Sequence, residues 1–250
     1  MTTSPTDQTQ QRLVDRFGRV ATDLRVSLTD RCNLRCTYCM PAEGLDWLPG
    51  DEVLTDDEVV RLIGVATGQL GVREVRFTGG EPLVRRGLVS IVARTREVAP
   101  EAELSITTNA LGLAKMAESL AEAGLDRVNV SLDSIRPEIF AEITRRDRLA
   151  DVVAGLEAAA DAGLGPIKIN AVLLRGVNDD QAAELLGWSV ERGYELRFIE
   201  QMPLDAQHGW SRDKMVTADE TLAALSAAFD LMYVMGGRVR ETPDATTFTT

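Results

Sequence analysis

Histidine is almost absent from this chain of 250 residues, in which His208 is the only one. Metal sites built from several histidines are therefore excluded, and a histidine-based catalytic triad would have to include this single residue. We expect His208 to be an ordinary loop residue with no part in catalysis.

Positive charge is also scarce, since 27 Lys and Arg stand against 39 Asp and Glu and give a formal net charge of −12. This balance argues against general nucleic-acid binding, which depends on a basic surface. A phosphorylated small molecule remains compatible with it, because a few arginines in one cleft outweigh a distant acidic surface.

Long apolar runs are missing too, and none approaches the roughly 20 residues that cross a bilayer. The first residues, MTTSPTDQTQQRLVD, lack the basic and apolar regions of a secretory signal. We therefore expect a cytoplasmic protein without a membrane partner, in a compartment where clustered cysteines indicate metal binding or catalysis more often than disulfides.

Cysteine is confined to one stretch, DRCNLRCTYCM, where Cys32, Cys36 and Cys39 have the spacing Cys-x3-Cys-x2-Cys. Three closely spaced cysteines disfavour a disulfide framework. Structural zinc takes four protein ligands, and no fourth cysteine or nearby histidine is present. A [4Fe–4S] cluster usually takes four thiolates, so three would leave one iron open to a small molecule. We favour such an open-site cluster; zinc with a more distant ligand and unliganded thiols are the alternatives.

Short β-branched runs alternate with amphipathic helical stretches along the chain. Strands are predicted within 23–28, 72–78, 103–110, 125–133, 165–174 and 194–202, and helices within 54–71, 87–99, 113–124, 136–144, 149–163, 178–193 and 216–229. This rhythm predicts an α/β fold with a parallel sheet, and a barrel, a partial barrel and an open doubly wound sheet all fit it. Polar and small residues gather near the carboxyl ends of the strands, which is where barrel enzymes assemble their chemistry: Cys32, Gly79, Gly80, Thr107, Ser131, Lys168 and Met202.

Four basic residues lie inside otherwise apolar strand patterns: Arg25, Arg76, Lys168 and Arg197. A cation inside a strand is costly to bury unless an anion pairs with it. Each one could point to solvent or pair with a neighbouring acid. Four of them from four strands favour a common site for a polyphosphate.

The segment CNLRCTYC resembles the Cys-x3-Cys-x-aromatic-Cys signature of radical S-adenosylmethionine (SAM) enzymes, with Tyr38 as the aromatic residue. The resemblance implies that the open iron binds SAM and that the cluster cleaves it to a 5′-deoxyadenosyl radical, which takes a hydrogen from the substrate. RFTGGEP, residues 76–82, resembles the family's GGE segment, so Gly79, Gly80 and Glu81 are expected to contact the methionine part of SAM. Without the cysteines, that segment would pass for an ordinary strand–turn–helix junction.

A closer resemblance, from about Phe17 to Phe229, is to the GTP 3′,8-cyclase family of molybdenum cofactor biosynthesis. It implies a partial TIM-like (β/α)6 barrel of the radical SAM type and conversion of GTP to 3′,8-cyclo-7,8-dihydroguanosine 5′-triphosphate. It also implies an electron donor and allows a homodimer. The matching positions are Cys32, Cys36 and Cys39 for the cluster; Tyr38, Gly80, Ser131 and Met202 for SAM; and Arg25, Arg76, Thr107, Lys168 and Arg197 for GTP.

The family holds a second [4Fe–4S] cluster with three cysteines of a C-terminal region, whereas no cysteine follows Cys39 here. We expect this chain to lack that region. The expected organisation is a disordered arm at 1–16, the barrel at 17–232, and a polar tail or the start of the missing region at 233–250. A radical SAM enzyme for another substrate, such as a peptide, and a catalytically incomplete cluster-binding module are the alternatives.

Overall fold

The computed structural model describes residues 12–203 and 209–232 of the chain. The expected loop residue His208 and the expected tail at 233–250 lie outside the described residues. None of the helices in the described ranges has the length and apolar character that a membrane span requires.

One sheet of six strands forms the centre of the described part of the chain. Its strands are β1 (Asp23–Ser27), β2 (Glu74–Thr78), β3 (Glu103–Thr108), β4 (Arg127–Ser131), β5 (Lys168–Val172) and β6 (Glu195–Ile199). They pair in chain order, and every pair is parallel. A doubly wound sheet would reverse its strand order at a switch point, so this order confirms the partial barrel.

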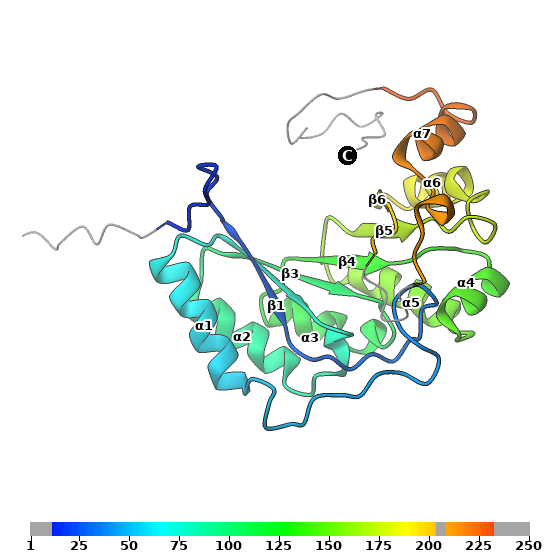
Figure 1. Ribbon diagram of the computed structural model, residues 1–250. Helices are drawn as coiled ribbons and strands as arrows, with labels where there is room; N and C mark the ends of the chain where they lie inside the picture. The colour runs from blue at the N-terminus through cyan, green and yellow to red at the C-terminus, as the bar shows by residue number, and fades with distance from the viewer. Residues whose placement is uncertain (1–11, 204–208, 233–250) are drawn as a thin grey trace, which may run out of the picture.

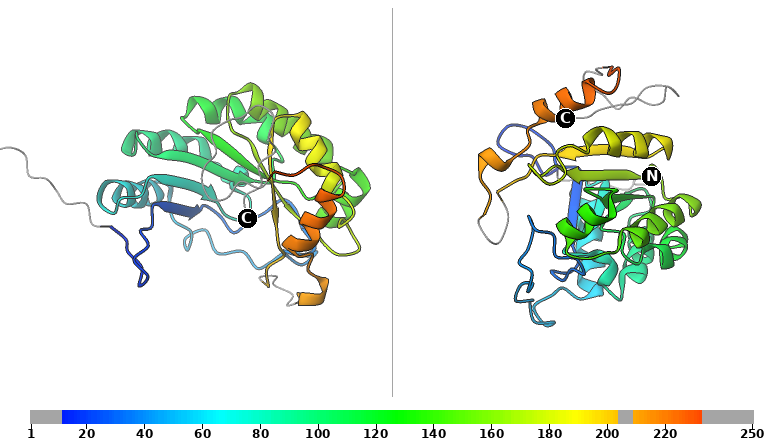
Figure 2. Two further views of the ribbon diagram at one scale, coloured as in Figure 1. Left: turned by 90° about the horizontal axis from the view of Figure 1, so that it is seen from above. Right: turned by 90° about the vertical axis from the view of Figure 1, so that its right-hand side faces the viewer.

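Helices cover the outer, convex side of the curved sheet (Figures 1 and 2). They are α1 (Asp56–Gln69), α2 (Leu88–Val98), α3 (Ala117–Glu122), α4 (Pro137–Thr144), α5 (Leu149–Asp161), α6 (Ala182–Glu191) and α7 (Ala218–Ser226), with short 3-10 turns η1 (Pro82–Val84), η2 (Leu113–Lys115) and η3 (Arg212–Lys214). Thr55 caps α1 in a reciprocal capping box with Glu58. The prediction of a single helix at 113–124 is wrong in one respect. The structure has two elements there, η2 and α3, and Met116 with φ −122° separates them.

The alternation of side chains along each strand separates the core from the barrel interior. In β2, Val75 and Phe77 are fully buried in the core, whereas Glu74, Arg76 and Thr78 are partly exposed on the opposite face. Successive strand residues point to opposite faces, so this pattern places Arg76 inside the barrel.

A long connection joins β1 to α1 and crosses the carboxyl end of the sheet (Figure 1). Its first part, residues 30–40, carries the three cysteines and is called the cysteine loop below. At the other end of β1, residues 12–22 form a turn in which Val14 and Val20 make an antiparallel bridge. The backbone N–H groups of Phe17 and Arg19 donate to Asp15 in that turn.

Candidate functional site

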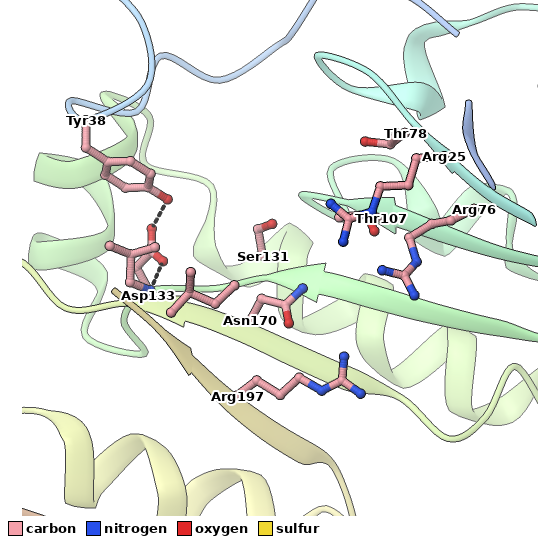
Figure 3. Close-up of a pocket in the computed structure, with 11 residues that line it drawn as sticks. Arg25, Tyr38, Arg76, Thr78, Thr107, Ser131, Asp133, Asn170 and Arg197 are labelled. Atoms are coloured by element: carbon pink, nitrogen blue, oxygen red, sulfur yellow. Dashed lines mark hydrogen bonds between the residues drawn. The ribbon is translucent and has the colours of Figure 1, made fainter. Parts of the chain in front are cut away.

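A pocket of about 320 Å³ opens on the interior face of the sheet. Its lining comes from all six strands of the sheet and from the segments that follow β1 and β4 (Figure 3): Arg25, Tyr38, Arg76, Thr78, Thr107, Ser131, Asp133, Asn170, Val172, Arg197 and Ile199. The register places Arg25 opposite Arg76 and Asn170 opposite Arg197. Strands far apart in the sequence therefore bring their polar residues to one cavity.

Three arginines extend into this pocket: Arg25, Arg76 and Arg197. Within the described residues, no ion pair includes Arg25, Arg76 or Arg197, and the Nε atom of Arg76 is buried with no hydrogen-bond partner. Burial lowers the pKa of Arg76, and the positive charges of Arg127, Arg25 and Arg197 lower it further. A buried guanidinium nitrogen with neither water nor acceptor is costly. The site thus has the charge and the unused donors to bind an anion.

The other interior cations are already neutralised. Arg127 pairs with Glu103 and, at 3.7 Å, with Glu74. Lys168 Nζ lies 2.9 Å from Glu195 Oε2 on the neighbouring strand, and Lys168 is not among the pocket-lining residues. Pairing with a neighbouring acid, one of the sequence-based interpretations, is therefore confirmed for Lys168. It does not hold for the three unpaired arginines.

The three cysteines lie on the loop that follows β1, with Cys32 and Cys36 half-buried and Cys39 exposed. Burial raises the pKa of each thiol, and the negative charge of Asp133 raises that of Cys36 further, followed by smaller contributions from Cys39 and Cys32. Such thiols need a bound cation to become thiolates.

No group of Cys, His, Asp or Glu side chains in the described ranges converges in the way that a single metal ion requires. A tetrahedral zinc site needs that convergence. A [4Fe–4S] cluster places each thiolate on a separate iron, so its ligands stand around a larger body. The three thiols are the type of donor that such a cluster takes.

Tyr38, between the second and third cysteine, is bound to the carboxyl end of β4. Its hydroxyl donates to Asp133 Oδ2 over 2.7 Å, and the Val172 backbone N–H donates to Asp133 Oδ1 over 2.8 Å (Figure 3). Burial raises the pKa of Asp133 to about 6 even though both hydrogen bonds lower it. Asp133 was not predicted as a site residue. Its position two residues after Ser131, on the same face, was the signal in the sequence.

Gly79 and Gly80 allow the cysteine loop to approach the end of β2 closely. Gly79 has φ +146°, and a Cβ there would lie 2.4 Å from Thr29 O. A Cβ on Gly80 would lie 2.4 Å from both Asp30 O and Arg31 O. The Gly80 N–H donates to Thr29 O over 2.7 Å. Glycine is therefore required at Gly79 and Gly80 because the backbone of residues 29–31 packs against them.

Glu81 joins the ends of β2 and β3. Its buried carboxylate accepts hydrogen bonds from the backbone N–H groups of Leu83 and Asn109 and from the Thr108 hydroxyl, at 2.7–2.9 Å. Burial raises its pKa. The expected contact of Glu81 with an ammonium group stays a prediction, and in this structure all three of these hydrogen bonds come from the chain.

Of the remaining predicted site residues, Ser131 and Thr107 line the pocket, whereas Met202 lies beyond β6, is 57% exposed and does not line it. The structure adds lining residues that the sequence analysis missed: Thr78, Asp133, Asn170, Val172 and Ile199. Four of them lie two positions after a predicted site residue: Thr78, Asp133, Asn170 and Ile199. The alternation of strand side chains was therefore the signal that could have found these four.

Residues 26–188 match the family model of the radical SAM superfamily. The chain therefore belongs to this superfamily, whose members use a [4Fe–4S] cluster and SAM. The fold agrees: Streptococcus suis SuiB bound to its precursor peptide SuiA superposes with a TM-score of 0.61 at 21% identity, over 73% of this chain and 40% of that one. At that identity the likeness concerns the fold alone.

Curated relatives are much closer in sequence. The GTP 3′,8-cyclase of Streptomyces coelicolor is 63% identical over 219 residues, which cover 88% of this chain and 64% of the relative. The GTP 3′,8-cyclase of Paenarthrobacter nicotinovorans is 61% identical, with 88% and 62% covered. The chain thus spans less than two thirds of the length of either of these relatives.

Proposed function

We propose that this chain is the radical SAM part of a GTP 3′,8-cyclase, which converts GTP to 3′,8-cyclo-7,8-dihydroguanosine 5′-triphosphate in the first step of molybdenum cofactor biosynthesis. The observation that carries the proposal is the buried Nε of Arg76, which has no hydrogen-bond partner among the described residues and lies between Arg25 and Arg197, two arginines without an ion pair in the same part of the chain. A triphosphate supplies the negative charge and the acceptors that these groups lack. The identity of 63% to a named cyclase supports the same substrate.

In this proposal Cys32, Cys36 and Cys39 hold a [4Fe–4S] cluster that leaves one iron to SAM. When bound, the cluster and SAM together supply a radical that abstracts hydrogen. The residues assigned to SAM are Tyr38, Gly79, Gly80, Glu81, Ser131 and Met202. Of these, Tyr38 and Ser131 line the pocket.

The residues assigned to GTP are Arg25, Arg76, Thr107, Lys168 and Arg197. Thr107 adds a hydroxyl on β3 beside the arginine pocket. Lys168 would exchange its partner Glu195 for a phosphate oxygen. The pocket thus offers the guanidinium groups of Arg25, Arg76 and Arg197 to one polyanion.

We further assign residues 17–232 to the barrel, residues 1–16 to an arm, and residues 233–250 to a tail or the start of a C-terminal region with the second cluster. The proposed setting is the cytoplasm, with a separate electron donor and a homodimer as the assembly. The proposal includes no nucleic-acid partner, because a chain with a net charge of −12 lacks the basic surface that binds a phosphate backbone.

The test is made anaerobically on the chain reconstituted with iron and sulfide. SAM and dithionite are added with and without GTP, and 5′-deoxyadenosine and cyclised nucleotide are quantified together. We expect GTP to stimulate formation of 5′-deoxyadenosine. Stimulation by a peptide but not by GTP would support the other-substrate alternative, and SAM binding without any 5′-deoxyadenosine would support the non-catalytic module.

A further inference from the structure

The cysteine loop rests on the last turn of α4, far along the chain. Arg35 N donates to Thr144 O over 3.1 Å, and Thr37 N donates to Ile143 O over 2.9 Å. The last carbonyls of a helix have no partner within the helix. The end of α4 and the cysteine loop therefore satisfy each other's backbone groups.

Arg145 follows directly and ends α4 in the left-handed conformation, with φ 56° and ψ 28°. Glycine or asparagine is the usual residue at such a position, because a longer L side chain is strained there. The Nη1 atom of Arg145 donates to Arg35 O over 2.8 Å and to Met40 O over 3.1 Å.

These two carbonyls flank the segment that contains the second and third cysteine. Within the segment, Cys39 N and Met40 N both donate to Cys36 O over 3.0 Å, which makes a closed turn. The guanidinium of Arg145 thus bridges the two ends of a turn that carries two of the three thiols. Arg35 fixes the preceding part in a similar way, donating to Cys32 O over 2.7 Å.

We propose that Arg145 is a positioning residue that shapes the cysteine loop before the cluster is inserted. By bridging Arg35 O and Met40 O, it fixes the separation of Cys36 and Cys39 in the cluster-free chain. A preformed ligand set binds its metal group more tightly, because less ordering remains to be done on binding. The proposal rests on the assignment of these cysteines as cluster ligands.

The test uses Arg145→Gly, which removes the guanidinium and at the same time relieves the backbone strain. Arg145→Asn also tolerates the left-handed conformation and replaces the glycine variant if that variant does not fold. The matched control is Arg146→Ala, which removes an exposed cation at the next position. Arg145→Lys is the conservative variant, which keeps a charged donor at the helix end.

Amide hydrogen exchange is measured first, on the cluster-free chain under anaerobic conditions. We expect exchange across residues 35–40 to accelerate by about tenfold in Arg145→Gly, with the melting temperature unchanged or higher. In Arg146→Ala the amides of residues 35–40 should exchange as fast as in the parent. In Arg145→Lys their exchange rate should lie between those of the parent and Arg145→Gly. Unchanged exchange in Arg145→Gly and Arg145→Asn would overturn the proposal.

The second measurement is the rate at which a chelator removes iron from the reconstituted proteins. We expect faster loss from Arg145→Gly and Arg145→Asn than from the parent or Arg146→Ala. Equal rates would overturn the link between the loop and the cluster. A parent that takes up no iron would instead contradict the ligand assignment, whereas the exchange experiment would still decide whether Arg145 orders the loop.

Discussion

Tyr38 and Asp133 are joined by a hydrogen bond of 2.7 Å between residues 95 positions apart. It ties the cysteine loop to the carboxyl end of β4, where the Val172 N–H also donates to the same carboxyl group. The loop with the thiols and the pocket with the arginines therefore share one buried acid. We expect substitutions of Asp133 to affect the structure of both the cysteine loop and the pocket.

Asp133→Asn should change how stability depends on pH. Burial raises the folded-state pKa of Asp133 from 3.8 to about 6, so between these values the folded chain binds more protons than the unfolded chain. The free energy of unfolding therefore falls as pH rises through this window, by about 3 kcal/mol from this group, and the loss is complete above pH 6.

Urea unfolding of the cluster-free chain at several pH values checks this prediction. The amide cannot titrate, so Asp133→Asn should show a smaller fall in stability with rising pH than the parent. Asp147→Asn, at an exposed position, is the matched control and should follow the parent. Identical pH profiles for the parent and Asp133→Asn would contradict the assignment.

Gly80→Ala should destabilise the cysteine loop. The added Cβ would lie 2.4 Å from the carbonyl oxygens of Asp30 and Arg31, and backbone atoms cannot move aside as a flexible side chain can. We expect a loss of about 3 kcal/mol in the free energy of unfolding. Gly68→Ala, in α1 where a Cβ has nothing within 4 Å, should instead be neutral or stabilising. A Gly80→Ala chain as stable as the parent would refute the close approach.

Arg76→Gln should raise stability and weaken anion binding at once. The parent carries a partly buried guanidinium beside three other arginines, and its removal relieves both desolvation and repulsion. Loss of a charge-assisted contact should weaken GTP binding by about 10-fold to 100-fold.

Calorimetric titration with GTP and a thermal melt measure the two effects on the same preparation. Arg61→Ala, on the exposed face of α1, is the control for a general loss of positive charge. Unchanged GTP affinity in Arg76→Gln would remove this arginine from the binding site.

Glu195→Gln should strengthen GTP binding, because the carboxylate holds Lys168 at 2.9 Å and adds a negative charge near the pocket. We expect affinity to rise by about threefold to tenfold at low salt and the gain to shrink at high salt. The control is Glu157→Gln, which removes an exposed carboxylate on α5. It tests whether the loss of any acidic side chain raises the affinity for GTP. Weaker binding in Glu195→Gln would mean that the carboxylate orients Lys168 instead of competing for it.

The sequence predicts each strand and most helices because their signals are local. In β2, for example, Val75 and Phe77 alternate with polar residues. The cysteine spacing is local as well, so the candidate cluster site could be predicted from one segment.

Contacts between strands could not be predicted in this way, because they depend on register. Nothing within β5 shows that Lys168 meets Glu195, or that Arg25 lies opposite Arg76. The bonds from Arg145 to the cysteine loop and from Tyr38 to Asp133 also join segments about 100 residues apart. Such partners follow from how the strands, helices and loops are arranged around the curved sheet, and the sequence pattern predicts only the class of that fold.

The most direct test of the central claim is the iron content and electron paramagnetic resonance spectrum of the anaerobically reconstituted, dithionite-reduced chain, with and without SAM. An open-site cluster predicts four irons per chain, a spectrum that changes when SAM is added, and loss of both in Cys36→Ser. Bound zinc in place of iron, or a spectrum that SAM leaves unchanged, would contradict the assignment of Cys32, Cys36 and Cys39 to an open [4Fe–4S] cluster.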